Sequence, residues 1–221
     1  MHFSAHEPLS FPLYFYQPYE VEQILLPDNA NCLAVQTLLK MCDLSFQVEP
    51  RWNTENMSPT NKVPVVRSGS FVLSGFEDIV TFLNRKGINL SKDLDKDDLT
   101  SLRAFISLVN KVLYHAELYV CWCDDNIYNN VTRKRHGSVY PWPLNHIMNW
   151  QKRNQVYRKL DAVQWGNKTM DSVLEDVRKC CDALSAKLEN KRYFFGDRYI
   201  LKKNKISNYL AIFLFRFFCR T

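Results

Sequence analysis

The sequence predicts a small α/β domain built on a four-stranded sheet, followed by an all-helical domain. Between residues 21 and 87, short apolar runs of strand type and two helical patterns follow one another in the order β-α-β and then β-β-α. After residue 98, the apolar patterns have the spacing of helices. Residues 88–98 are charged and polar, which is typical of a linker. The order within 21–87 is the thioredoxin-like plan of a sheet covered by helices.

Composition predicts a globular protein and argues against nucleic acid as a partner. The chain has 221 residues, of which 46% are hydrophobic, enough for a packed core. Its formal charge is +6, and residues 198–221 hold six of the 29 Lys and Arg and no acid. Residues 1–197 therefore have 23 Lys and Arg against 23 Asp and Glu and are formally neutral. Nucleic-acid binding needs clustered cations, and the body as a whole has no excess of them.

The seven cysteines predict reduced thiols and neither disulfides nor a metal site. Their number is odd, and most fall within apolar helical patterns. Cys121 and Cys123 form a C-x-C without a second ligand pair at zinc spacing, and Cys180 and Cys181 are adjacent. No apolar run approaches the roughly 20 residues that a membrane-spanning helix needs.

The elements of the α/β domain are assigned in chain order. Residues 1–20 are rich in proline and aromatics, which predicts a flexible lead-in whose end forms an edge strand. The first strand is expected in QILL (23–26) and a turn with several possible N-caps in PDNAN (27–31). A helix follows, whose apolar residues recur at helical spacing from Cys32 to Cys42. SFQVEPR then predicts a strand parallel to the first, and KVPVV and SFVLS predict two strands joined at Ser68-Gly69, before a helix over 77–84.

The helical domain is predicted to cover residues 99–197. Residues 99–123 form a long, mainly apolar helix, and residues 124–143 form a loop that closes on YPWP, where prolines stop one element and start the next. A helix over 144–163 follows, and Thr169 is the expected N-cap of a further helix.

Several blocks of residues carry a resemblance to a known family. The sequence resembles the glutathione-transferase fold and, more closely, the metaxin family, in the blocks ILLPDNANCLAVQTLLKMC, MSPTNKVPVV, AELYVCWCDD, YPWPLNHIMNWQK and WGNKTMDSVLEDVRKCCDALSAKL. These blocks lie in the family's order between about residues 21 and 196. The resemblance implies a thioredoxin-like domain over 21–87 and a glutathione-transferase C-terminal-like domain over 99–197.

The resemblance also implies a function and a location. Metaxins are non-enzymatic components on the cytosolic face of the mitochondrial outer membrane. They pair with one another and join the sorting and assembly machinery that inserts β-barrel proteins. We therefore expect another metaxin and the β-barrel assembly core as partners, peripheral membrane association, and no cofactor.

The same resemblance locates a vestigial glutathione site. In the transferases a proline, usually cis, follows an apolar residue, and Val63-Pro64 matches that position. An acid-serine pair then opens the next helix and binds the glutamyl carboxylate. The matching positions are Gly75 and Phe76, which carry no hydroxyl. The expected role of Ser74, one residue earlier, is to cap that helix.

One alternative function is a glutathione-dependent transferase or thiol enzyme that uses Cys32. This cysteine is expected about one turn inside its helix, where the helix N-terminus could lower its pKa. The competing interpretation is a small residue that faces the core. No Ser, His and acid set has the spacing of a catalytic triad.

Candidate partner contacts lie in the predicted loop and the helix after it. Arg133, Lys134 and Arg135 belong to the basic cluster RKRHG, interpreted either as a solvated loop or as a contact with anionic headgroups or an acidic partner. Tyr140, Trp142 and Trp150, with Trp165, are either core residues or hot spots for a partner.

The end of the chain departs from the family pattern. Residues 198–221 are basic and aromatic, and the cap and acid that open a buried helix in the family are missing. We expect a C-terminally truncated helical domain with a divergent tail. The alternative is a tail that lies on a membrane surface or packs as a last helix.

Overall fold

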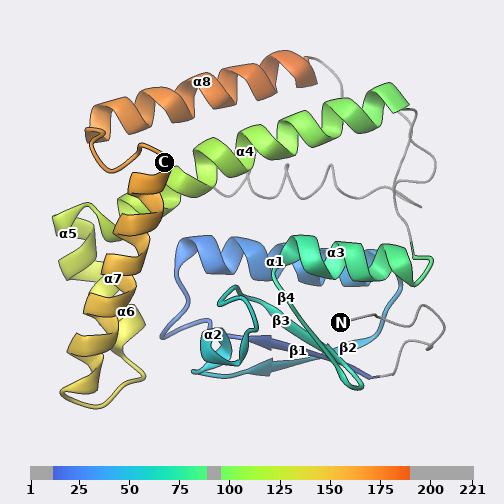
Figure 1. The fold of residues 1–221 in the computed structure, drawn as a ribbon, viewed down its shortest axis with the longest axis horizontal. Coiled ribbons are helices and arrows are strands. Elements are labelled where there is room, and N and C mark those ends of the chain that lie inside the picture. The colour runs from blue at the N-terminus through green and yellow to red at the C-terminus, as the bar shows by residue number, and fades with distance from the viewer. Residues whose placement is uncertain (1–11, 89–95, 190–221) are drawn as a thin grey trace. The chain divides into compact units, whose positions relative to one another are not determined.

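The computed structural model describes residues 12–88 and 96–189, which form two compact units (Figure 1). Among these residues, one unit comprises 12–21 and 28–88, and the other comprises 22–27 and 96–189. The tail 198–221, most of the linker and the first eleven residues of the lead-in lie outside the described residues. Within the described residues, no helix has the length and hydropathy required to cross a membrane.

The first unit is a four-stranded mixed sheet with helices, as the sequence predicts. Its elements are β1 (Leu13–Gln17), α1 (Leu26–Met41), β2 (Phe46–Pro50), α2 (Thr54–Met57), β3 (Val65–Ser68), β4 (Phe71–Ser74) and α3 (Phe76–Arg85). The strand order is β2-β1-β3-β4. β1 pairs parallel with β2 and antiparallel with β3, so that Phe15 lies opposite both Val48 and Val66. Helices α1 and α3 cover one face of the sheet (Figure 1).

The core of this unit forms where that face meets the two helices. Phe15 from β1, Leu39 from α1 and Ile79 from α3 are each at most 1% exposed. The rings of Phe71 on β4 and Phe82 on α3 lie 5.4 Å apart, which fixes α3 on the sheet.

Two sequence predictions for the start of this unit are wrong. The first strand is Leu13–Gln17, inside the predicted lead-in, and it is a central strand and not an edge strand. QILL is not a strand, and PDNAN belongs to the first turns of α1 and not to a turn between elements. A proline is tolerated in the first helical turn because its missing N–H would have no partner there, and Asp28 interacts favourably with the positive end of the helix dipole.

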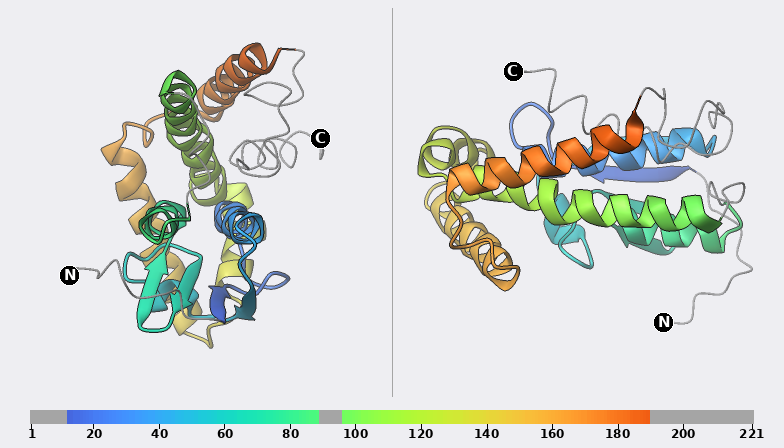
Figure 2. Two further views of the ribbon diagram at one scale, coloured as in Figure 1. Left: turned by 90° about the vertical axis from the view of Figure 1, so that its right-hand side faces the viewer. Right: turned by 90° about the horizontal axis from the view of Figure 1, so that it is seen from above.

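The second unit is helical. Its elements are α4 (Lys96–Trp122), α5 (Asp125–Ile127), a π-helical turn η1 (Tyr128–Thr132), α6 (Arg133–Gly137), α7 (Leu144–Ala162) and α8 (Met170–Leu188). Helices α4 and α8 run antiparallel side by side, and α7 crosses near the C-terminal end of α4 (Figures 1 and 2). The predicted long helix, the helix over 144–163 and the N-cap at Thr169 are confirmed, since the Thr169 hydroxyl accepts from the Ser172 N–H at 3.3 Å.

The predicted loop over 124–143 is wrong for its first fourteen residues. Asp124 caps α5 by accepting from the Ile127 N–H at 2.7 Å, and helical geometry then continues to Gly137 through η1. A π-helical turn holds more residues than an α-helical turn. The apolar residues before and after η1 are therefore not related by a single 3.6-residue period. The sequence pattern across 124–137 looks irregular as a result, which is why it predicts a loop.

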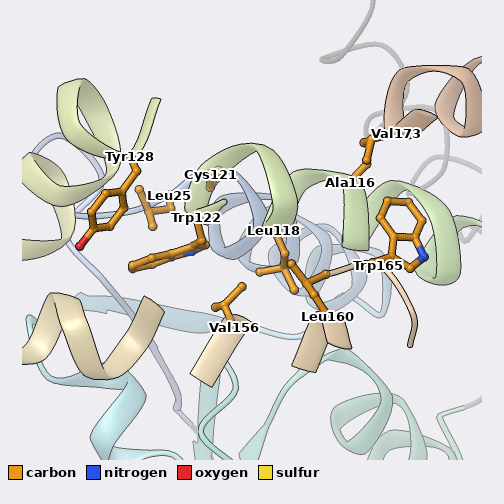
Figure 3. Close-up of a cluster of buried hydrophobic side chains, with 10 residues drawn as sticks. All are labelled: Leu25, Ala116, Leu118, Cys121, Trp122, Tyr128, Val156, Leu160, Trp165 and Val173. Atoms are coloured by element: carbon orange, nitrogen blue, oxygen red, sulfur yellow. The ribbon is translucent and has the colours of Figure 1, made fainter. Parts of the chain in front are cut away.

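A cluster of apolar side chains joins α4 to its neighbours. Figure 3 shows Leu118 and Trp122 of α4 facing Val156 and Leu160 of α7, while Val173 of α8 approaches Ala116. Trp122 is 1% exposed and Leu160 is fully buried. Trp165 is also buried, at 7% exposure, and belongs to this core.

Candidate functional site

The loop that would hold the cysteinyl part of glutathione keeps its backbone layout. The Val63-Pro64 bond is cis, and both residues are buried. The Gly75 N–H donates to the Pro64 carbonyl at 2.9 Å, which ties this loop to the start of α3.

The first two positions of α3, the N-cap Gly75 and Phe76, carry no side-chain group that could hold a carboxylate. Gly75 is the N-cap, with a φ of 76°, and no side chain caps the helix. Phe76 is its first residue. A side chain at Gly75 would meet the methylenes of Lys62, whose Cδ would lie 3.1 Å from the added Cβ. The hydrocarbon stem of Lys62 therefore lies against Gly75, which matches the first residue of the acid-serine pair that the resemblance implies.

The capping role expected for Ser74 is wrong. Its hydroxyl is buried, at 2% exposure of the residue, and lies 2.7 Å from the hydroxyl of Thr60. This hydrogen bond fastens the end of β4 to the segment before β3 and leaves Gly75 as the cap.

Cys32 has the environment of a core residue. It lies in the second turn of α1, which begins at Leu26, so the expected position about one turn inside the helix is confirmed. The residue is 1% exposed. Burial raises the pKa of its thiol well above the usual value, and the carboxylates of Asp28 and Glu20 raise it further. These observations support the interpretation of Cys32 as a residue that faces the core and oppose a lowered pKa, and the thiol is protonated at neutral pH.

No group of three His, Cys, Asp or Glu side chains that could hold a metal ion occurs among residues 12–88 and 96–189.

The other raised thiol pKa values have the same physical cause as that of Cys32. Burial is the largest influence on Cys123 and on Cys180, and it raises the pKa of each to about 11.

A second candidate site is an exposed apolar surface at the start of α7. We define the α7 surface by four residues: Trp142 is 79% exposed, Trp150 64%, Ile147 47% and Leu144 41%. The buried side of the same helix carries Asn149, Val156 and Leu160. Ile147 and Trp150 are three positions apart in the helix, so their side chains are neighbours, and they lie on the side opposite the buried residues.

The backbone before α7 holds Trp142 between two prolines. The Trp142-Pro143 bond is cis, and Pro143 is the N-cap of α7. The N–H groups of Asn145 and His146 donate to the carbonyls of Pro141 and Pro143, each at 3.1 Å. These bonds fold the YPWP stretch onto the first turn of the helix.

A buried polar link fixes α6 against α7. His136 donates from Nδ1 to Oδ1 of Asn149 at 2.8 Å, and the Asn149 amide donates to the Arg133 carbonyl at 3.1 Å. The imidazole of His136 also packs edge-on to Trp122, with the ring centroids 5.3 Å apart. The prediction that RKRHG is a solvated loop is therefore wrong, since the cluster is helical and His136 is buried.

The predicted contact residues differ in exposure. Arg133 is exposed and donates to Nδ1 of His146 at 2.8 Å, and Lys134 is exposed beside it. Arg135 is half-buried, and its Nε donates to the Ile24 carbonyl at 3.2 Å. Tyr140 is half-buried against the ring of His136, at 5.9 Å between centroids. Trp142, Trp150, Arg133 and Lys134 are thus available at the surface, whereas Arg135 and Tyr140 support it.

Sequence reasoning missed Leu144 and Ile147, and it missed the local charge. Residues 126–160 contain seven Lys and Arg and no Asp or Glu; the seven are Arg133, Lys134, Arg135, Lys152, Arg153, Arg158 and Lys159. Residues 1–197 are neutral as a whole because acidic residues elsewhere in the chain balance these seven cations. A count over a shorter window would have found it.

Comparison with known proteins gives consistent results. Residues 32–153 match the family model Tom37, described as an outer mitochondrial membrane transport complex protein. The chain is 48% identical to Metaxin-2 of Mus musculus over 195 residues, which are 88% of this chain and 74% of that protein. It is 27% identical to Metaxin-1 of Macaca fascicularis over 193 residues, 84% of this chain and 61% of that protein.

Solved structures with the same fold are glutathione transferases. Transferase GSTFuA3 from Phanerochaete chrysosporium superimposes with a TM-score of 0.57, over 94% of this chain and 84% of its own, at 15% sequence identity. An identity this low supports the fold and carries no information on chemistry.

Proposed function

The chain belongs to the metaxin family, as its sequence blocks predict, and we propose that it is a non-enzymatic subunit of the sorting and assembly machinery of the mitochondrial outer membrane. In this role it acts on the cytosolic face of the membrane, to which it is bound peripherally. It supports protein import and the assembly of β-barrel membrane proteins through protein contacts. Its partners are a metaxin of the Metaxin-1 type and the β-barrel assembly core.

The exposed tryptophans of the α7 surface are the observation that carries this proposal. Tryptophan is among the residue types most enriched at binding hot spots, and an exposed apolar patch often marks a site of interaction with another protein. Trp142 and Trp150 are the most exposed of the tryptophans in the helical unit, whereas Trp122 and Trp165 are buried. Trp142, Trp150, Arg133 and Lys134 are the proposed contact residues, with Tyr140 and Arg135 in support.

The former glutathione site supports a non-enzymatic role. Gly75 and Phe76 provide no hydroxyl, the stem of Lys62 lies over Gly75, and Cys32 is a buried, protonated thiol. A transferase needs a group that stabilises the glutathione thiolate and one that anchors the glutamyl carboxylate. We propose that Val63, Pro64, Gly75 and Phe76 now have structural roles only.

Purification of tagged full-length chain from detergent-solubilised outer membrane tests the proposal. We expect a metaxin of the Metaxin-1 type and a subunit of the β-barrel assembly core to co-purify with it. Their absence from the wild-type preparation would remove the support for a scaffold role.

A parallel assay addresses the enzymatic alternative. The chain is passed over glutathione agarose and incubated with glutathione and an electrophilic substrate. Neither retention nor turnover is expected. Retention and conjugation that Cys32→Ala abolishes would establish the transferase and refute the non-enzymatic role.

A further inference from the structure

The α7 surface has the charge of a site for an acidic partner. Residues 126–160, which include α6 and all of α7 except its last two residues, contain no carboxylate side chain, and Asp161 in the last turn of α7 is the first one after them. Four of the seven cations in this segment form hydrogen bonds within the helical unit or are half-buried. Of these, Arg135 donates to the Ile24 carbonyl, Arg153 to Asp125 and to the Trp122 carbonyl, and Lys159 to the Tyr114 hydroxyl, while Lys152 is half-buried.

The other three cations are exposed on α6 and α7. Arg133 is placed next to the first turn of α7 by its hydrogen bond to His146, and Lys134 follows it on α6. Arg158 is exposed eleven residues after Ile147, about three helical turns along the same side of α7. Neither Lys134 nor Arg158 has an acidic partner within the described ranges 12–88 and 96–189.

The rigidity of the surface favours a protein over a lipid bilayer as the occupant. Trp142 is flanked by Pro141 and Pro143, and Ile147 and Trp150 stand on a helix anchored by buried Asn149. Arg133 forms a hydrogen bond to His146 on the first turn of the same helix, at 2.8 Å. A preorganised surface gains affinity for a partner of fixed, complementary shape, because fewer side chains are immobilised on binding. A fluid headgroup layer has no fixed shape to complement.

We propose that the α7 surface binds a folded protein face that has an apolar pocket or groove surrounded by carboxylates. In the bound state Trp142, Leu144, Ile147 and Trp150 fill the apolar centre, and Arg133, Lys134 and Arg158 lie opposite the carboxylates. This assignment rests on the proposed function, in which a protein partner exists, and adds the surface that is used and the chemistry of the partner.

The test measures binding of the full-length chain to a purified metaxin of the Metaxin-1 type by isothermal titration calorimetry. Two variants remove the two parts of the surface: W142A/W150A removes the aromatic anchors, and K134E/R158E reverses two cations. Two matched controls alter the same residue types elsewhere. Trp52→Ala removes a tryptophan that is 46% exposed, and R103E/R178E reverses two exposed cations on α4 and α8. An unchanged thermal unfolding midpoint shows that each variant is folded.

The expected results differ between the two variants. W142A/W150A weakens binding by at least about 100-fold, since two hot-spot residues are lost. K134E/R158E weakens it by about tenfold at about 50 mM NaCl, and much less at about 500 mM NaCl, where charges are screened. Both controls bind as the wild-type chain does.

Each other outcome refutes a defined part of the reasoning. If the wild-type chain binds the partner and both surface variants bind it equally well, the assignment of the α7 surface is wrong while the proposed function stands. If the wild-type chain does not bind the partner at all, the proposed function fails, and this assignment with it. A flotation assay with vesicles containing about 30% phosphatidylserine completes the test. Binding to these vesicles that W142A/W150A abolishes, without an effect on the protein partner, assigns the surface to lipid and refutes the proposal.

Discussion

Replacement of Arg153 by alanine should destabilise the helical unit more than replacement of any exposed cation. The Arg153 guanidinium connects α7 to the C-terminal end of α4. Its Nε donates to the Trp122 carbonyl at 2.9 Å, and its Nη2 donates to Asp125 at 2.6 Å and to the Tyr157 hydroxyl at 3.1 Å. The same guanidinium lies 4.0 Å from the ring centroid of Tyr128.

The magnitude follows from these contacts. A hydrogen bond from a charged donor to a carbonyl contributes about 1.5–3 kcal/mol, and a partly exposed cation-π contact contributes about 0.5–1 kcal/mol. The ion pair with Asp125 contributes less than about 0.5 kcal/mol, because the Asp125 side chain is 81% exposed. R153A should therefore lower the free energy of unfolding by about 2–4 kcal/mol. R153K keeps the charge but loses the fork geometry, and should lower it by about 1–2 kcal/mol.

Urea denaturation followed by tryptophan fluorescence measures this effect. Four of the five tryptophans, at positions 122, 142, 150 and 165, lie in the helical unit, so the signal reports mainly on that unit. The midpoint should fall while the m-value stays constant. D125N and R158A, which alter exposed groups, should change stability by less than about 0.5 kcal/mol. If R153A is no more destabilising than R158A, Arg153 does not hold α4 and α7 together.

Three further predictions concern other parts of the chain. Gly137→Ala should lower the free energy of unfolding by about 1–3 kcal/mol. The new Cβ would lie 2.6 Å from the side-chain nitrogen of Asn149 and would displace the amide that links α6 to α7. Thermal unfolding measures the loss. Stability should fall as the pH rises from about 9 towards 11. The pKa values of Cys123 and Cys180 are raised to about 11 in the folded state, so folding favours the protonated thiols, and this contribution is lost as they ionise. Urea midpoints at several pH values measure the fall, and the double variant C123S/C180S should show a smaller one. Thr169→Ala should lower stability by about 1 kcal/mol because α8 loses its N-cap; the urea midpoint measures it.

Each of these predictions has a result that would contradict it. Gly87 has open space for a Cβ but a φ of 81°, so Gly87→Ala should cost about 1 kcal/mol through backbone strain alone. Gly137→Ala brings no such strain, so a variant as stable as the wild-type chain would mean that the contact with Asn149 is unimportant. A pH profile that C123S/C180S leaves unchanged would assign the alkaline loss to other groups. Retention of full stability in Thr169→Ala would mean that the hydroxyl does not cap α8.

The sequence predicted regular elements well where an apolar pattern with one period continued for several turns. The helices α3 and α8 are of this kind, because their apolar residues lie on one side of the helix. The prediction failed at β1, because the five residues LYFYQ are aromatic and polar and sit among prolines, so the strand is defined by its pairing with β2 and β3 and not by its own pattern. It failed again at η1, where a π-helical turn interrupts the 3.6-residue spacing.

The candidate site could be predicted in its residues but not in its burial. The sequence singles out Trp142 and Trp150 as hot-spot or core residues, and only the tertiary structure decides that they are exposed and that Trp165 is buried. Likewise, RKRHG is interpreted from the sequence as a polar loop, because four of its five residues are basic or polar and none is apolar. The bond from His136 to Asn149 depends on a partner thirteen residues away that no local pattern reveals.

The route of the chain has a practical consequence for dissecting this protein. Residues 22–27 belong to the helical unit although they lie between β1 and most of α1, so within residues 12–189 the chain passes between the units three times. A fragment cut at the linker and spanning 96–189 would lack Leu25, a member of the buried cluster, and the Ile24 carbonyl that Arg135 binds. Expression of that fragment alone should yield a less stable product than the same unit in the intact chain. Domain deletions therefore are poor tools for assigning function here, and point substitutions are to be preferred.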